Sequence, residues 1–402
     1  MIELPKILKK RETYIERIKP FIGKDIIKVL TGQRRVGKSF ILFLLVDYIV
    51  RNYETSNIIY INKESFDFDF IKSAKELNDY INSKVDSSKK NYIFIDEIQD
   101  IEGFERVLRS LALNDNVDIY ITGSNANMLS GELATYLSGR YVEFQINSLS
   151  YSEFLYFHNI KDSAENLNKY LKYGGLPYLI NLELNDLVVF EYLKNIYNTI
   201  LYRDIISRYN LRSTHLLEKL VQFIADNIGS IFSAKRISDY LKSQQINLSP
   251  TQILNYIQYL NNSFFIKKVE RYDIIGKKIF ESSEKYYFEN LGIRNALVGF
   301  KINDLAKVIE NGVYNHLIYK GYKVNVGKFN GFEIDFIAQK NNEIEYYQVA
   351  MNLIEDSTIK REFGNLLSIK DNYPKTVISL DKFDGNTYQG IKHQGLREFL
   401  LS

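Results

Sequence analysis

The stretch from Ile26 to Ile49 limits the possible folds more than any other part of the chain. It reads IIKVLTGQRRVGKSFILFLLVDYI, an apolar run of strand length, a loop with two glycines and a run with helical periodicity. The loop matches the pattern G-x-x-x-x-G-K-[ST], the phosphate-binding P-loop, and the strand and helix that this motif requires flank it. A chance glycine-lysine turn is the alternative. The segment predicts a nucleotide-binding α/β domain with a parallel sheet.

Positions in this loop have distinct roles in holding a nucleotide. Glycines allow the backbone to curl so that its N–H groups point at phosphate oxygens, and the start of the following helix adds its positive dipole. Lys38 is expected to reach the β- and γ-phosphates, and the Ser39 hydroxyl to bind Mg²⁺. ATP and Mg²⁺ are therefore the predicted cofactors. The predicted nucleotide-binding residues are Gly32, Gln33, Arg34, Arg35, Val36, Gly37, Lys38, Ser39, Phe40 and, from a later turn, Pro177.

Two further strands are predicted to end beside this loop. The first, YIFIDEIQ from Tyr92 to Gln99, ends in two acids. Asp96 is expected beside the Mg²⁺ held by Ser39, and Glu97 is expected to orient and deprotonate the attacking water. The second, IYITGSN, ends at Asn125, whose amide could position that water; capping of a strand-terminal turn is the alternative.

Arg140 follows a predicted helix after this strand. It could project from the protein and act as an arginine finger on the γ-phosphate of a neighbouring copy, an interaction worth roughly 10³ to 10⁵ in rate. A surface arginine beside a glycine is the alternative. Near the start of the chain, Arg11 could touch the adenine base or could be a surface charge.

The four segments GQRRVGKS, YIFIDEIQ, ITGSNANMLS and LSGRYVEFQINSLSYSEFL occur in this order and spacing. Together they resemble the bacterial and archaeal AAA+ ATPases that join a P-loop module to a carboxy-terminal domain of unknown function. Those proteins are related to the signal-transducing and origin-recognition branch of AAA+ proteins. The resemblance covers essentially the whole chain. It implies Lys38, Ser39, Asp96 and Glu97 as the ATP and Mg²⁺ set, Asn125 as sensor 1 and Arg140 as a finger candidate.

Length and composition indicate a multidomain globular protein. The 402 residues exceed one ordinary core, and 45% hydrophobic and 25% charged residues are ordinary for such a protein. No cysteine is present, which excludes disulfides and zinc-thiolate sites. The start lacks the apolar region of a secretory signal, and no segment suits a bilayer, so we expect a cytoplasmic protein without a membrane partner. The predicted domains are 1–150 (AAA+ ATPase), 151–212 (helical lid), 213–290 (winged helix-turn-helix) and 291–402 (restriction-endonuclease-like).

The predicted lid is rich in helices and is interrupted once, by Gly174-Gly175-Leu176-Pro177. Glycines let a backbone pass close to a planar base and proline fixes the approach, so this turn could contact adenine on the lid side. The resemblance implies the same role. An ordinary turn between helices is the alternative.

Three helices followed by strands at 264–271 and 277–281 indicate the winged helix-turn-helix. Its third helix begins at Ser249 and Pro250, and its exposed face offers amides but no Lys or Arg, a poor match for phosphates. DNA contact, if present, is predicted through the wing. A packing or protein-contact module is the alternative. The basic residues of the wing are Lys267, Lys268, Arg271, Lys277 and Lys278.

The order of helices and strands after Leu291 resembles the restriction-endonuclease-like fold. The nuclease site of that fold, PD-(D/E)XK, uses two acids to hold Mg²⁺ and a lysine to activate water. Asp335 matches the first acid, Gln348 stands where Glu or Gln is accepted, and Glu310 adds an acid from the first helix. Ala350 replaces the lysine, and Lys360 is a remote substitute. The resemblance therefore implies a degenerate nuclease fold used for binding or assembly.

Taken together, these features predict an ATP-hydrolysing switch that couples nucleotide state to the C-terminal domains and acts on nucleic acid or a nucleic-acid-bound complex. A homo-oligomer is possible. One alternative is a regulatory ATPase that acts only on protein partners. Another is an ATP-gated, Mg²⁺-dependent nuclease.

Overall fold

A computed structural model describes residues 5, 7–126, 137, 139–279, 284–380 and 385–402 of the chain. The chain divides into two compact units. The first comprises residues 1–147 together with 262–264, and the second comprises residues 148–261 and 265–402. Among the residues described, no helix is both long enough and apolar enough to cross a membrane.

The first unit is built on a five-stranded parallel sheet with the strand order β2-β3-β4-β1-β5. Because the strands are parallel, their carboxyl ends meet at one edge, where the P-loop begins. The predicted α/β class is confirmed. The elements are α1 (Glu12–Ile18), β1 (Ile27–Thr31), α2 (Lys38–Asn52), β2 (Ser56–Asn62), α3 (Ala74–Lys84), β3 (Lys90–Asp96), α4 (Phe104–Leu111), β4 (Val117–Gly123) and β5 (Tyr141–Gln145), with short 3₁₀ turns at Lys19–Phe21, Phe66–Phe68 and Ile98–Asp100.

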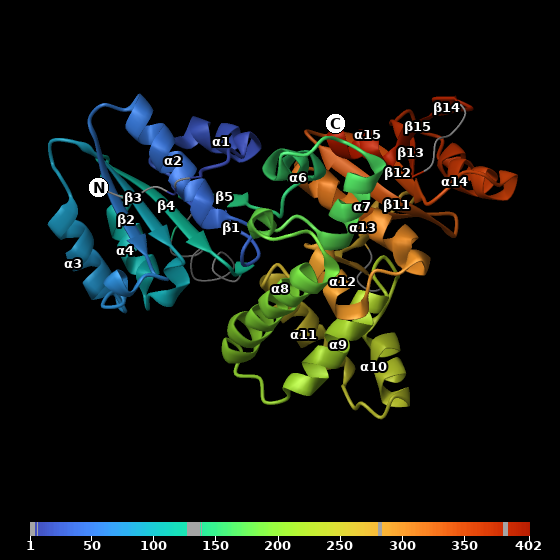
Figure 1. Ribbon diagram of the computed structural model, residues 1–402, viewed down its shortest axis with the longest axis horizontal. Coiled ribbons are helices and arrows are strands. Elements are labelled where there is room, and N and C mark those ends of the chain that lie inside the picture. The colour runs from blue at the N-terminus through green and yellow to red at the C-terminus, as the bar shows by residue number, and fades with distance from the viewer. Residues whose placement is uncertain (1–4, 6, 127–136, 138, 280–283, 381–384) are drawn as a thin grey trace. The chain divides into compact units, whose positions relative to one another are not determined.

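Helices cover both faces of this sheet, with α1 and α2 on one side and α3 and α4 on the other (Figure 1). Alternate strand residues point to opposite faces, so each strand supplies both cores. Isoleucines and valines of β1 to β4 pack against the apolar side chains of α3 and α4. On the other face Phe43 of α2 stacks on Tyr60, and Phe94 stacks on Tyr120. Burial on both faces explains why these strands read as continuous apolar runs.

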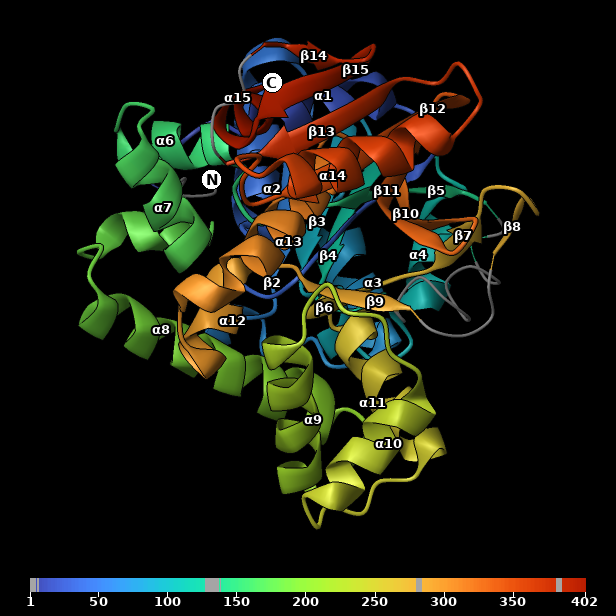
Figure 2. The ribbon, with the colours of Figure 1, turned by 90° about the vertical axis from the view of Figure 1, so that its right-hand side faces the viewer.

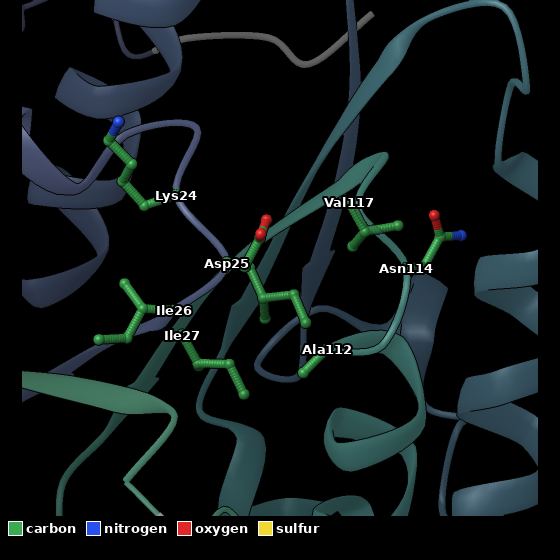
Figure 3. A pocket seen from close by; sticks show the side chains of 8 residues that line it. Lys24, Asp25, Ile26, Ile27, Ala112, Asn114 and Val117 are labelled. Carbon is green, nitrogen blue, oxygen red and sulfur yellow. The ribbon is translucent and has the colours of Figure 1, made fainter.

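A buried ion pair joins β1 and β4 near the amino-terminal edge of the sheet. The Lys28 ammonium contacts the Asp118 carboxylate, and both side chains are fully buried. Gly23 N–H and the Tyr120 hydroxyl also donate to Asp118. Figure 3 shows a small hollow at this edge, far along the strands from the P-loop. Its lining residues are Lys24, Asp25, Ile26, Ile27, Ala112, Asn114, Val117 and Ile119.

The second unit begins with helices. Serine and asparagine caps define several helix starts, and the predicted start at Ser249 is a capping box in which the Gln252 N–H and side chain exchange hydrogen bonds with Ser249. The helices are α6 (Tyr151–His158), α7 (Ala164–Tyr173), α8 (Asp186–Thr199), α9 (Thr214–Asp226), α10 (Ala234–Ser243), α11 (Pro250–Asn262) and α12 (Leu291–Val298), with a 3₁₀ segment at Pro177–Asn181 and a π-helix at Ile200–Ser207.

An eight-stranded mixed sheet with the order β14-β15-β13-β12-β11-β10-β7-β8 forms much of the rest of the second unit. Helix α13 (Leu305–Tyr319) precedes β10, and a 3₁₀ turn at Ile302–Asp304 precedes α13. The remaining elements are β7 (Arg271–Asp273), β8 (Lys278–Ile279), β10 (Lys323–Phe329), β11 (Phe332–Lys340), β12 (Glu343–Ala350), α14 (Asp356–Ser368), β13 (Lys375–Ser379), β14 (Thr387–Tyr388), β15 (Ile391–Gly395) and α15 (Leu396–Leu401).

The strands predicted to form one wing lie in two different sheets. Strand β6 (Ile266–Val269) pairs with β9 (Lys285–Phe288), whereas the β7–β8 hairpin extends the large sheet beyond β10 (Figure 2). The change of sheet occurs at Glu270, whose carbonyl accepts a hydrogen bond from Val326 N–H at 3.0 Å. An edge strand has unpaired backbone groups, and β7 satisfies those of β10. The two strand segments predicted for the wing therefore do not pair with each other as one hairpin, and the winged helix-turn-helix stays a prediction.

Candidate nucleotide-binding site

The P-loop backbone needs its glycines. Gly32 has φ +146°, and a Cβ on this residue would lie 2.1 Å from the Ile146 carbonyl oxygen. Gly37 has φ +98° and caps the start of α2. A side chain at Gly32 would collide with rigid backbone, so this close approach explains the first glycine of the motif.

Lys38, the first residue of α2, has its ammonium inside the loop. It donates to the carbonyl oxygens of Gly32 at 3.0 Å and Gln33 at 3.2 Å. The Glu97 carboxylate lies 3.7 Å from the same nitrogen. The side chain is only 3% exposed. A cation buried at the start of a helix, beside the curled loop, is the arrangement that binds the phosphates of a nucleotide.

The two residues predicted to bind Mg²⁺ lie near each other. The Ser39 hydroxyl is close enough to the Asp96 carboxylate to lower its pKa, and this carboxylate accepts a hydrogen bond from the Thr122 hydroxyl. Burial raises the pKa of Asp96 above its ordinary value, against the opposite effect of these two hydroxyls. A hydroxyl and a carboxylate at one edge of the sheet are oxygen donors of the type that Mg²⁺ prefers, so the residues present fit this ion.

Glu97 has a left-handed backbone with φ +56°, which is unusual for a residue with a side chain. Its N–H donates to the Thr122 hydroxyl oxygen at 2.9 Å, and the Gln99 side-chain amide contacts its carboxylate. These contacts hold the backbone turn and direct the carboxylate toward Lys38. Thr122 and Gln99 were missed by the sequence reasoning. The only signal for Thr122 was its place near the end of the second polar-ended strand.

Two buried side chains at this edge have polar atoms that meet no partner among the described residues. They are the Gln33 amide, 1% exposed, and the Ser124 hydroxyl, 1% exposed. Buried polar groups are nearly always hydrogen-bonded, so orphaned ones call for a missing ligand or water. Asn125, predicted as sensor 1, is 3% exposed and follows Ser124. These groups fit a loop that closes around a phosphate chain and a water molecule.

The other predicted loop residues differ in their surroundings. Arg34 is buried and pairs with Glu64 at 3.2 Å, so its charge is already matched. Val36 is fully buried, whereas Arg35 and Phe40 are exposed. Of these four, Arg35 and Phe40 have side chains open to solvent, and a contact of either with nucleotide stays a prediction.

Arg11 is a brace for the loop and not a surface charge. It is 2% exposed and donates to the Val36 carbonyl and to the Asn147 carbonyl, both at 3.0 Å. Its guanidinium also lies over the Tyr14 ring, 4.6 Å from the centroid. Arg11 therefore ties α1 to the P-loop and to the segment after β5, a role that spacing along the chain does not reveal.

Arg140 and Pro177 stay predictions. Arg140 is exposed and precedes β5, at the end of the sheet opposite the P-loop, since its carbonyl accepts from Ile27 N–H. It is therefore remote from the site of its own copy. The helix expected before it falls on residues 127–136 and 138, which lie outside the described residues.

Pro177 is the first residue of the 3₁₀ segment Pro177–Asn181. Gly175, two residues earlier, packs against the Leu149 carbonyl, and a Cβ on Gly175 would lie 2.3 Å from that carbonyl oxygen. That glycine is thus required by a protein contact.

The acidic residues predicted in the C-terminal domain do come together. Asp335 N–H donates to the Gln348 side-chain oxygen at 3.3 Å, and the Lys285 ammonium lies 3.8 Å from Asp335 and 2.8 Å from Glu310. Burial and then the Glu310 charge raise the pKa of Asp335 well above its ordinary value. Lys360 is exposed on α14. The cation beside these acids is therefore Lys285, from β9.

The basic residues of the predicted wing are not one continuous patch. Lys268 pairs with Glu284 at 3.0 Å, and Lys267 and Arg271 are half-buried. Lys277 and Lys278 are exposed at the β7–β8 turn. DNA contact through these residues stays a prediction.

Comparisons with known proteins agree with this geometry. Residues 24–155 match the model of an AAA domain, and residues 164–304 match that of a domain of unknown function. An uncharacterized protein of Haemophilus influenzae is 39% identical over 99% of this chain and 100% of its own length. One of Methanocaldococcus jannaschii is 29% identical over 91% of this chain and 83% of its own length.

Solved structures give weaker matches. The ORC1 protein of Aeropyrum pernix, determined in complex with DNA, is 14% identical over 73% of this chain and 93% of that one, with a TM-score of 0.31. DnaA of Aquifex aeolicus, determined with AMPPCP, is 15% identical over 63% of this chain and 89% of that one, with a TM-score of 0.31. These scores are too low to support an argument. The full-length relative and the matched segment are sufficient: the chain belongs to the same family as the Haemophilus influenzae protein, and its residues 24–155 form an AAA domain.

Proposed function

We propose that this protein is an ATP-hydrolysing AAA+ switch. The observation that carries the proposal is the meeting of Lys38, Asp96 and Glu97 at one edge of the parallel sheet, beside the P-loop. The orphaned Gln33 and Ser124 groups at the same edge add support, because a bound nucleotide and its water would satisfy them.

The residues divide the reaction of ATP with water among them. Lys38 exchanges its carbonyl partners for phosphate oxygens and stabilises the charge that develops on the γ-phosphate. That exchange frees the Glu97 carboxylate to accept the proton of the attacking water. Asn125 holds this water in line. Mg²⁺, held by Ser39 and Asp96, would neutralise charge on the phosphates.

The switch follows from what hydrolysis removes. The γ-phosphate can bind Asn125 and the loop only before it leaves, so ATP and ADP favour different conformations. We infer that this difference is transmitted to the C-terminal domains, whose target is nucleic acid or a complex bound to it. Exposed Lys277 and Lys278 support a nucleic-acid target, and the pairing of Lys268 with Glu284 favours the alternative of a protein target.

ATP binding and turnover test the core of the proposal. Lys38→Ala is expected to abolish binding of Mg-ATP in calorimetry, whereas Glu97→Gln keeps binding and loses turnover. Exposed Lys89 and Glu102 provide matched controls, as Lys89→Ala and Glu102→Gln. Absence of ATP binding by the wild-type protein would overturn the proposal.

Turnover with and without DNA tests the target. A nucleic-acid target predicts that single-stranded or duplex DNA changes the ATPase rate in a salt-dependent way, and that Lys277→Ala with Lys278→Ala weakens the effect. Lys360→Ala with Lys370→Ala, which removes two exposed lysines outside the predicted wing, is the matched control. An ATPase rate indifferent to DNA would favour protein partners.

A further inference from the structure

Lys285, the first residue of β9, projects into a cluster of three acids from other elements. Its ammonium lies 2.8 Å from the Glu310 carboxylate on α13. On β11, Glu333 lies at 2.6 Å and Asp335 at 3.8 Å from the same nitrogen. One lysine from the β6–β9 pair thus contacts the acids of a helix and of the large sheet.

This cluster is largely closed to solvent. The Lys285 side chain is 2% exposed, and those of Asp335 and Glu310 are 10% and 17% exposed, so only Glu333 at 35% opens substantially to water. Tyr287, fully buried, donates to Glu310 at 2.5 Å. A nuclease site must admit a DNA backbone to its acids and metal, and this burial argues against that use.

The hydrogen bonds of Asp335 leave one of its carboxylate oxygens facing the Lys285 ammonium. Asp335 accepts from Val349 N–H at 2.8 Å with its second oxygen, so its first oxygen is left to face Lys285. With the Lys285 ammonium between them, Glu310, Glu333 and Asp335 are not arranged to hold a metal ion, and neither are any other three His, Cys, Asp or Glu side chains among the described residues. Buried carboxylates need a nearby cation. The methyl group of Ala350 cannot provide one, and Lys285 does.

We propose that Lys285 is a tethered cation that takes the position a divalent metal ion would occupy among Glu310, Glu333 and Asp335. It neutralises the acids from within, makes this domain independent of metal, and fastens the β6–β9 pair to α13 and β11. The proposal involves the second unit only, so it stands or falls separately from ATP hydrolysis.

Mn²⁺ is the probe for this proposal. The melting temperature and Mn²⁺ binding, the latter by electron paramagnetic resonance, are measured on the full chain in the absence of nucleotide. The melting temperature of the wild-type protein is expected to change by less than about 1 °C when Mn²⁺ is added. Lys285→Met leaves the acids without their cation, so its melting temperature should be lower than that of the wild type. Binding of Mn²⁺ should then raise the melting temperature of this variant by about 5 °C. Adding Asp335→Asn should remove this recovery.

A matched control separates the cluster from an ordinary ion pair. Lys268→Met breaks a single ion pair, the one between the exposed Lys268 and Glu284. Mn²⁺ should not change the melting temperature of this variant. Because Asp96 and Ser39 could bind Mn²⁺ weakly, every arm is repeated in an Asp96→Asn background. Mn²⁺ binding to the wild-type cluster that Asp335→Asn removes would overturn the proposal, as would a folded Lys285→Met protein without Mn²⁺ binding. The wild-type arm decides the matter if Lys285→Met does not fold.

Discussion

Removing the Thr122 hydroxyl tests how the two acids of β3 are held. This hydroxyl donates to the Asp96 carboxylate and accepts from Glu97 N–H at 2.9 Å, and the residue is fully buried. Thr122→Val keeps the shape but loses both bonds. A buried N–H without a partner costs about 1–3 kcal/mol, and a lost hydrogen bond to a charged group costs about 1.5–3 kcal/mol. The Ser39 hydroxyl near the Asp96 carboxylate offsets part of this cost, so we expect a loss of about 2–4 kcal/mol in the free energy of unfolding.

Hydrogen exchange of the amides in β3 and β4 measures this loss within the first unit. Turnover should also fall, since Glu97 depends on this hydroxyl for its left-handed turn, whereas the affinity for ATP should stay within a few-fold because the P-loop is untouched. Thr122→Ser keeps the hydroxyl and should behave almost as wild type. Unchanged amide protection together with full turnover in Thr122→Val would refute the bridging role.

Three other perturbations have defined outcomes. Glu97→Gln should lower steady-state phosphate release by at least about 10²-fold while ATP affinity by calorimetry is retained, and equal loss of both would contradict its role as base. Arg11→Met removes two hydrogen bonds to the Val36 and Asn147 carbonyls, so calorimetry should show weaker ATP binding; unchanged affinity would mean that the loop needs no brace. Burial lowers the pKa of His316 from 6.5 to about 4. The unfolded chain takes up this proton more readily, so stability is full above pH 6.5 and falls by up to about 3 kcal/mol toward pH 4; the melting temperature of His316→Leu should vary less with pH over this range.

Local patterns were sufficient to predict the loop conformation and the position of its acids, while the roles of these residues in ATP hydrolysis stay predictions. The spacing from Gly32 to Ser39 fixed the P-loop, and the polar ends of two apolar strands indicated Asp96 and Asn125 at the same edge. Each of these inferences depends on a short stretch whose conformation is set by its own residues. The helix starts were readable for the same reason, because caps such as Ser249 act within one turn.

Contacts between distant segments could not be read in this way. Thr122 reaches Asp96 and Glu97 only through the pairing of β3 and β4, and Gln99 acts through the strained turn at Glu97. The pairing of β7 with the edge of β10 could not be predicted either, because the alternation of side chains along one strand does not reveal which distant strand it will join. Lys285 lies 25 residues before Glu310 and more than 40 before Glu333, so no motif joins them.

The position of β1 between β4 and β5 has a consequence for biosynthesis. The strand that carries the P-loop is made first, yet its two neighbours in the sheet are residues 117–123 and 141–145. Until these emerge from the ribosome, both edges of β1 lack partners and its apolar side chains stay uncovered. Nascent chains shorter than about residue 145 should therefore attract chaperones and bind no nucleotide.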